Sequence, residues 1–152
     1  MAVHSAGILL YRREPLQVFL IHPGGPFWAR KDLGAWSIPK GLVGESEEPL
    51  AAARREFFEE TGFRAEGEAE ALGTFRQPSG KRLTVWAMEG DCDPAKLVSG
   101  TFSMPWPPRS KQMREFPEAD RGAWFGHDEA LRRILKGQAP IVEKFYGQRP
   151  KG

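Results

Sequence analysis

Three glutamates, Glu56, Glu59 and Glu60, are spaced so that a helix would carry them side by side. Because an α-helix advances by about 100° per residue, the three fall within an arc of about 100°. The apolar residues Leu50 and Phe57 fall on a different face, as expected for a helix that packs against a core. Carboxylates three or four residues apart repel by about 0.2–0.5 kcal/mol per pair. Since Mg²⁺ prefers carboxylate oxygens, the acidic face predicts a divalent-cation site, although a solvated acidic surface would show the same pattern.

Two neighbours on the same predicted helix are consistent with such a site. Arg55 lies one turn before Glu59, where it can pair with that carboxylate and hold it in orientation. Ala52, one turn below the carboxylates, is small enough to leave space for ions. The charge distribution is also consistent with a cation site. Residues 45–70 hold nine acidic and three basic residues, although the net charge of the chain is +2. A concentrated acidic site in a basic protein suits a cation that holds an anionic ligand.

The spacing around these glutamates extends over residues 41–63, GLVGESEEPLAAARREFFEETGF. The segment resembles the Nudix box, G-x₅-E-x₇-R-E-U-x-E-E-x-G-U, where U is a bulky apolar residue. The matching positions are Gly41, Glu47, Arg55, Glu56, Phe57, Glu59, Glu60, Gly62 and Phe63. Phe57 stands where an aliphatic residue is more common, and it keeps the apolar role. A looser resemblance covers most of the chain, including residues 5–12, 36–41 and 124–125.

The resemblance to the Nudix hydrolase superfamily implies an α/β fold, an α/β/α sandwich with a mixed sheet, formed by one domain over residues 1–152. It implies that the loop–helix–loop of the box binds Mg²⁺, or Mn²⁺ in its place. By position in the motif, the metal ligands would be the carbonyl of Gly41 and the carboxylates of Glu56, Glu59 and Glu60, with Glu47 as a further candidate. Arg55 would be structural within this catalytic set. The reaction implied is hydrolysis of a nucleoside diphosphate linked to another group.

The general base is not fixed in this superfamily, so a carboxylate outside the box is also a candidate. Glu115, Glu118 and Asp120 precede the predicted late strand at Trp124. Glu118 stands six residues before Trp124, a placement that resembles an acidic residue of dinucleoside polyphosphate hydrolases. We therefore expect Glu118 to contact metal or water, and the alternative is a solvated loop carboxylate.

Substrate contacts are expected from three residues. Lys40 lies beside the predicted metal loop, where it would meet a phosphate unless it is a surface charge. Trp106 and Arg109 lie in an irregular segment that also holds Lys111 and Arg114. Basic residues interleaved with an aromatic suit a polyphosphate clamp that stacks a base, although such an aromatic also serves to anchor a loop.

The elements that must position these residues follow from hydrophobic period and from Gly and Pro punctuation. The pattern predicts a helix over residues 50–61, with Pro49 in its first turn and Gly62 at its end. No regular period is seen in residues 90–122, so this segment is predicted to be an irregular connection. Strands are predicted over residues 3–11, 16–21, 36–38, 71–77, 82–89 and 124–125, and further helices over 128–136 and 141–146.

Length and composition limit the class of protein. The 152 residues suit one domain, and 40% hydrophobic with 28% charged residues is typical of a chain that folds in water. The apolar stretch Ala6–Tyr11 is far shorter than the roughly 20 residues of a membrane span. The single cysteine, Cys92, excludes an intramolecular disulfide. We therefore expect a cytoplasmic protein with no membrane partner. The resemblance to Nudix hydrolases implies that its substrate is a small nucleotide.

Several substrates stay open at this stage. The residues preceding the box and the position of Glu118 favour a dinucleoside polyphosphate or a nucleoside triphosphate, and ADP-ribose or another nucleotide sugar is the alternative. A non-catalytic nucleotide-sensing module is a different class, which is disfavoured because every carboxylate of the box is present. Nucleic acid is not an expected partner, because an RNA-cap enzyme would need a further RNA-binding region.

Overall fold

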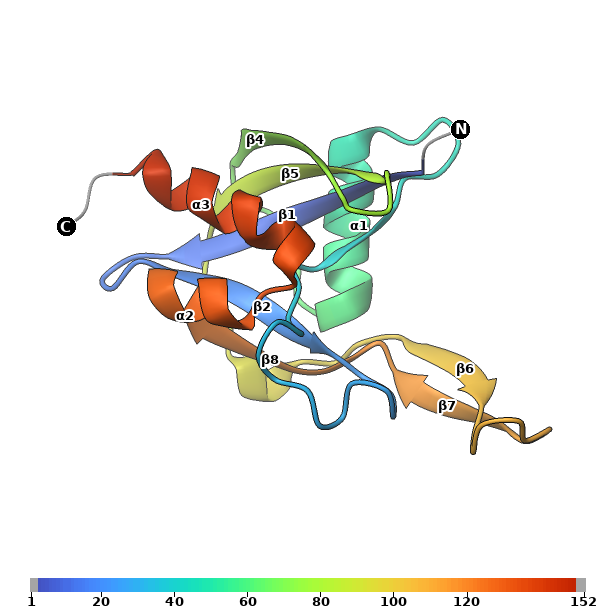
Figure 1. Cartoon of the computed structure of the whole chain (residues 1–152). Coiled ribbons are helices and arrows are strands. Elements are labelled where there is room, and N and C mark those ends of the chain that lie inside the picture. Colours follow the sequence, from blue (N-terminus) through green and yellow to red (C-terminus); the bar gives the residue numbers. More distant parts are fainter. Residues whose placement is uncertain (1–2, 150–152) are drawn as a thin grey trace.

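A mixed β-sheet forms the centre of the computed structural model, which describes residues 3–149 (Figure 1). The main path of the sheet has the order β4-β5-β1-β2-β8, and β3 pairs with β1 beside it. The strands are β1 (His4–Arg12), β2 (Gln17–Pro23), β3 (Lys40–Leu42), β4 (Ala69–Arg76), β5 (Arg82–Glu89), β6 (Thr101–Pro105), β7 (Met113–Pro117) and β8 (Ala119–Phe125). The helices are α1 (Pro49–Thr61), α2 (His127–Arg133) and α3 (Ala139–Gly147), with short 3₁₀ turns at Pro94–Lys96 and Lys136–Gln138.

The central strand β1 pairs with β5 along one edge and with both β2 and β3 along the other edge. It runs parallel to β5 from the pair His4 and Arg82 to the pair Tyr11 and Glu89. On the other side its last residues pair with β2, whereas Ser5–Gly7 pair with β3. The sheet therefore divides at β1, and β3 delivers the start of the box to the middle of the protein.

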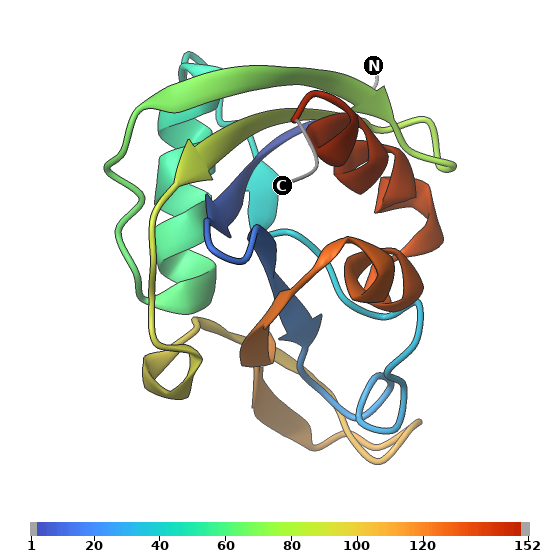
Figure 2. The ribbon, with the colours of Figure 1, turned by 90° about the vertical axis from the view of Figure 1, so that its left-hand side faces the viewer.

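Helices cover both faces of the sheet, with α1 on one side and α2 and α3 on the other (Figure 2). Alternate residues of β1 face opposite sides, as a strand requires. Ile8 packs in the cluster that contains Phe57 of α1, whereas Leu9 packs in the cluster that contains Phe145 of α3. Both faces are buried, which explains the nearly continuous apolar run of this strand. The α/β sandwich predicted from the sequence is confirmed.

Helix α1 begins and ends where the sequence predicts. Pro49 occupies its first turn, and Gly62 ends it with φ +79°, a left-handed conformation that favours glycine. The N–H of Gly62 donates to the carbonyl of Phe58 at 2.7 Å. Phe57 is buried against the sheet, and the buried Ala52 lies one turn before Glu56, beneath the carboxylates. Glu59 is exposed, whereas Glu56 and Glu60 are half-buried, so the acidic face reaches from the solvent to the edge of the core.

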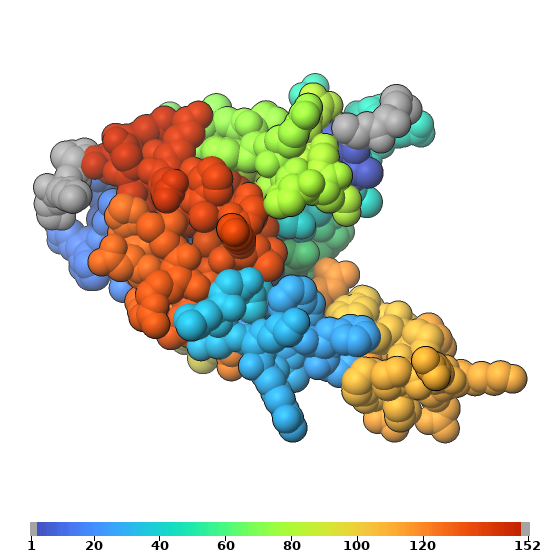
Figure 3. Space-filling view, viewed as in Figure 1, coloured from blue at the N-terminus to red at the C-terminus, as the bar shows by residue number. Residues whose placement is uncertain are grey.

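The prediction of an irregular connection over residues 90–122 is wrong. Strands β6 and β7 form an antiparallel hairpin within it, and β8 begins at Ala119. The hairpin stands out from the body of the protein next to the loop that follows β2 (Figures 1 and 3). The only alternation in β6 is the half-buried pair Phe102 and Met104, and nearly all of β7 is exposed, so the hydrophobic pattern that signals a strand is short.

The strand predicted over residues 36–38 is also wrong. Trp36 and Ser37 form only isolated bridges, to Ile134 and Ile21 respectively. The N–H of Ile38 donates to the side-chain oxygen of Gln138 at 3.0 Å instead of joining a ladder. The strand of this region is β3, which begins after Pro39. In the part of the chain that the structure describes, no helix has both the length and the apolar character needed to cross a membrane.

Candidate active site

Arg55 holds together the loop and the helix of the box. Its guanidinium donates to both carboxylate oxygens of Glu47, at 2.8 and 2.9 Å, and to the carbonyl of Leu42 at 3.0 Å. The same group donates to Glu56 at 2.8 Å and to Glu59 at 3.1 Å. These bonds lower the pKa of Glu47 to about 2, because Arg55 and then the N–H of Gly44 favour the charged carboxylate. Arg55 is thus the positioning residue of the acidic face.

Gly41 and Glu56 touch in a way that only glycine permits. A Cβ at position 41 would lie 2.0 Å from Cδ of Glu56 and 2.1 Å from its Oε2. The carboxylate therefore lies directly against the backbone of β3. Burial raises the pKa of Glu56, and the nearby charges of Glu59 and Glu118 raise it further.

Glu60 is the most enclosed carboxylate of the three. Its Oε1 accepts a hydrogen bond from the N–H of Lys40 at 3.0 Å. Burial raises its pKa to about 8, an effect that Lys40 opposes and that the charges of Glu118 and Glu56 reinforce. In the metal-free protein at neutral pH this carboxyl group is therefore mainly protonated.

Glu118 lies directly before β8, and hydrogen bonds of its own backbone hold it beside the site. Its carbonyl accepts from the N–H of Gly24 at 3.0 Å, and its own N–H donates to the carbonyl of Gly100 at 2.8 Å. The next residues are fixed by the buried ring of His22, whose Nδ1 lies 2.9 Å from Oδ1 of Asp120. Because the residue before β8 is clamped between two loops, its carboxylate is carried toward Glu60 and Glu56.

Glu60 and Glu118 line one cleft of about 480 Å³. One wall is the loop after β2, and the other is strand β6 of the hairpin. Apart from the two glutamates, its lining residues are Pro23, Gly24, Gly25, Pro26, Phe27, Trp28, Phe102 and Met104. The cleft thus joins an acidic end to an aromatic and apolar portion.

The donor set fits a hard divalent cation. The charge of Glu118 raises the pKa of both Glu56 and Glu60, and a cation would relieve that repulsion. Within residues 3–149, no three side chains of the ligating types already surround a single point. Arg55 neutralises Glu56 and Glu59 in this arrangement. The residues are of the right chemistry, and their metal roles stay a prediction.

The structure brings some predicted site residues together and leaves others apart. Lys40 lies beside Glu60, with its ammonium charge lowering the pKa of that carboxyl group. Glu59 instead borders a neighbouring groove with Arg55 and Arg64. Trp106 directly follows β6, and its ring lies edge-on to Phe27 at 5.9 Å between centroids. Arg109 is exposed in the turn of the hairpin, with φ +67°.

The sequence interpretation missed the apolar wall of the cleft. Phe27 and Trp28 follow the Gly- and Pro-rich residues 23–26, for which no element was predicted, and Phe102 and Met104 lie in the segment predicted to be irregular. The alternation of Phe102, Met104 and Trp106 was the available signal for a strand with one apolar face.

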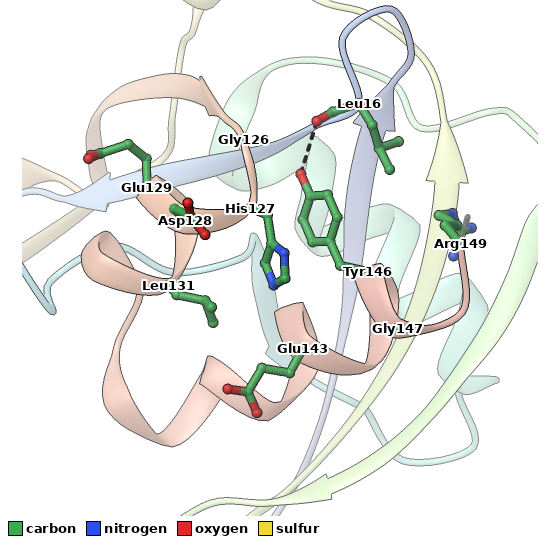
Figure 4. A pocket seen from close by; sticks show the side chains of 10 residues that line it. All are labelled: Leu16, Gly126, His127, Asp128, Glu129, Leu131, Glu143, Tyr146, Gly147 and Arg149. Carbon is green, nitrogen blue, oxygen red and sulfur yellow. Dashed lines mark hydrogen bonds between the residues drawn. The ribbon is translucent and has the colours of Figure 1, made fainter. Parts of the chain in front are cut away.

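A larger cavity, of about 870 Å³, lies between α2 and α3, away from the box (Figure 4). The ring of His127 stacks on Tyr146 at 4.3 Å, and the hydroxyl of Tyr146 donates to the carbonyl of Leu16 at 3.1 Å. None of the box residues lines this cavity.

Replacing Arg55 with lysine is expected to lower kcat/KM by about 10–100-fold, the range typical of groups that orient metal ligands. Lysine keeps the charge but cannot bond Glu47 at two points while reaching Glu56. Steady-state kinetics would measure the loss, with Arg76→Lys on the exposed edge of β4 as the control. Unchanged kinetics in Arg55→Lys would contradict a positioning role.

The raised pKa of Glu60 predicts how the stability of the metal-free protein depends on pH. Between the ordinary carboxyl pKa of 4.5 and about 8, the folded chain holds a proton that the unfolded chain lacks, so stability falls as the pH rises. In EDTA, Glu60→Gln is therefore expected to gain Tm relative to wild type between pH 5 and pH 9, because glutamine can still accept from the Lys40 N–H. Thermal unfolding at several pH values measures this, and a pH-independent difference in Tm would contradict it.

The protein is an α/β sandwich in which a mixed sheet lies between helices. Its loop–helix–loop presents carboxylates beside the central strand, so the sandwich carries an acidic site. The sequence model of the NUDIX domain matches residues 1–145, and the chain therefore belongs to the NUDIX family of hydrolases. This confirms the family assigned from the box.

Individual relatives agree with the family. An RNA pyrophosphohydrolase of Bartonella henselae is 60% identical over 75 residues, which is 42% of this chain and 43% of that protein. The chain spans less than half the length of the curated relatives it matches. An Ap4A hydrolase of C. elegans, solved as a binary complex, aligns with TM-score 0.64 and 19% identity over 95% of this chain and 96% of that one. The NUDIX domain of Shewanella oneidensis NrtR, solved with ADP ribose, aligns with TM-score 0.68 and 15% identity over 97% and 88%. At these identities the two structures show a shared fold.

Proposed function

We propose that the protein is a divalent-metal-dependent pyrophosphohydrolase that cleaves a nucleoside diphosphate linked to another group. Dinucleoside polyphosphates and nucleoside triphosphates are the proposed substrates. The observation that carries this proposal is the convergence of Glu56 and Glu60 of α1 with Glu118 from the start of β8, beside the backbone of Lys40 and Gly41. Carboxylates from two separate segments meet beside the backbone of a third, at the end of a cleft large enough for a small molecule.

The carboxylates of Glu56, Glu59 and Glu60 and the carbonyl of Gly41 are the proposed holders of Mg²⁺, or of Mn²⁺. The ion supplies neutralisation of the phosphate oxygens and activation of water. Arg55 keeps Glu56 and Glu59 in orientation through its hydrogen bonds. The ammonium of Lys40, next to Glu60, is placed to attract a phosphate oxygen of the substrate.

Glu118 is the proposed general base. Its side chain is exposed and lines the cleft, so water can reach it there. A proton taken from the attacking water would be held on its carboxylate while a bond from that oxygen to phosphorus forms and the phosphoanhydride bond breaks. The leaving phosphate departs with the electron pair of that bond.

A second candidate function is removal of phosphate groups from the 5′ end of RNA. The 60% identity to part of an RNA pyrophosphohydrolase favours it. Exposed basic residues at the end of the hairpin, Arg109 and Lys111, would suit the phosphates of a longer ligand. Hydrolysis of ADP-ribose and nucleotide sensing without turnover are the remaining alternatives.

One substrate panel tests the proposal. The protein is incubated in Mg²⁺ with diadenosine tetraphosphate, nucleoside triphosphates, ADP-ribose and 5′-triphosphorylated RNA, and products are separated by chromatography. Nucleotide release that stops in EDTA supports the pyrophosphohydrolase. Higher kcat/KM for RNA than for the free triphosphate would favour the second candidate, and tight nucleotide binding without turnover would favour the sensor.

A further inference from the structure

The apolar part of the cleft is a built surface with one wall on each of two segments. Phe27 and Trp28 come from the loop after β2, and Phe102 and Met104 come from β6. The ring of Phe102 lies so close to Gly25 that a Cβ there would be 2.8 Å from it. At Gly24 a Cβ would be 2.0 Å from the carbonyl oxygen of Pro117. The two walls are therefore fixed against each other by backbone contacts that only glycine allows.

The register of the hairpin shows which side chains share the face toward the cleft. Residues opposite each other on paired strands lie on the same face of a sheet. Met104 pairs with Arg114, so Arg114 lies on the same face as the cleft-lining Met104. Ser103 pairs with Glu115, which places this carboxylate on the other face. The cleft side of the hairpin is thus aromatic and basic, without its acidic residue.

Phe27 is unusual because it is a large aromatic residue that folding leaves open to solvent. Its side chain is 63% exposed, although the ring of Trp106 fixes one edge of it. Arg114 is exposed, and it forms no salt bridge within residues 3–149. An exposed ring at the mouth of a cleft, with a free guanidinium on the same side, provides a stacking surface next to an anion contact.

We propose that this cleft, between Phe27 and Trp28 on one wall and Phe102 and Met104 on the other, binds the base of the nucleotide by stacking while Arg114 contacts its phosphates. The proposal rests on the proposed function, because the phosphates must lie at the Glu60 and Glu118 end. The volume of about 480 Å³ lies within the roughly 300–1,000 Å³ of small-molecule sites.

The lining also sets the specificity of the cleft. Apart from the indole N–H of Trp28 and the weakly accepting sulfur of Met104, its side chains outside the two glutamates carry no hydrogen-bonding group. Stacking accepts every base, because each base has a π-face. The substrate class is therefore nucleotides of any base, and kcat/KM values for ATP, GTP, CTP and UTP are expected to agree within about tenfold.

The test compares Phe27→Ala with Met113→Ala, an equally exposed residue on the opposite face of the hairpin. Tripolyphosphate, a phosphoanhydride without a base, serves as the second substrate. Phe27→Ala is expected to raise KM for ATP by about tenfold, the size of one lost base stack, and to leave KM for tripolyphosphate unchanged. Arg114→Gln is expected to raise both KM values, and Met113→Ala neither.

Two outcomes would overturn the cleft proposal: Phe27→Ala with wild-type KM for ATP, or discrimination between bases of more than about a hundredfold. If the wild-type protein hydrolyses none of these compounds, the proposed function is wrong. Calorimetric titration with ADP then tests separately whether the cleft binds a nucleotide. ADP binding that weakens in Phe27→Ala and not in Met113→Ala would support the cleft without the enzyme. Absence of ADP binding to wild type would overturn it.

Discussion

Replacing Glu59 with glutamine is expected to lower kcat by more than about a hundredfold, because loss of a metal ligand exceeds the 10–100-fold cost of losing a group that only orients one. Glu59 is half exposed, and its contacts are with Arg55 at the surface of α1. The variant should therefore fold normally. Steady-state kinetics with diadenosine tetraphosphate and ATP in saturating Mg²⁺ measure the effect.

Glu68→Gln provides the matched control, since Glu68 is an exposed glutamate that lies beyond the box. Its kinetics should equal those of wild type. Turnover that survives in Glu59→Gln would remove Glu59 from the ligand set. The assignment of Glu56 and Glu60 would then depend on their own glutamine variants.

Gly41→Ala is expected to lower kcat by about a hundredfold with a small change in Tm. The added Cβ would lie 2.0 Å from Cδ of Glu56, so the carboxylate must move. The group that moves is the far end of a flexible side chain, and the fold can absorb that shift. A displacement of about 1 Å at a reacting centre can cost about a hundredfold in rate.

Gly24→Ala is the contrasting variant for this prediction. There the added Cβ would meet the backbone carbonyl of Pro117 at 2.0 Å, so the loop and the hairpin must separate. We expect a clear loss of Tm in Gly24→Ala and little in Gly41→Ala. If Gly41→Ala retains full activity, contact with Glu56 is not what requires glycine at this position.

Interpreting the sequence identified the box because all its parts lie within one short stretch. Helix α1 follows from Pro49, Gly62 and the spacing of apolar residues between them, and these are local signals. The contact of Arg55 with Glu59 follows from helical geometry, because residues four positions apart are neighbours on a helix. Strands β1 and β2 were also predictable, because burial on both faces makes them continuously apolar.

The sequence could only suggest Glu118, and the tertiary structure decided where it lies. It is separated from Glu60 by 58 positions in the chain, and its place depends on the pairing of β8 with β2 and on the bonds to Gly24 and Gly100. The aromatic cleft depends on the same long-range contacts. Hydrophobic period and helix or strand propensity depend on residues that are near one another in the sequence. Sheet register and loop packing bring together residues that are far apart in the sequence, and the residue types do not show which of these will meet.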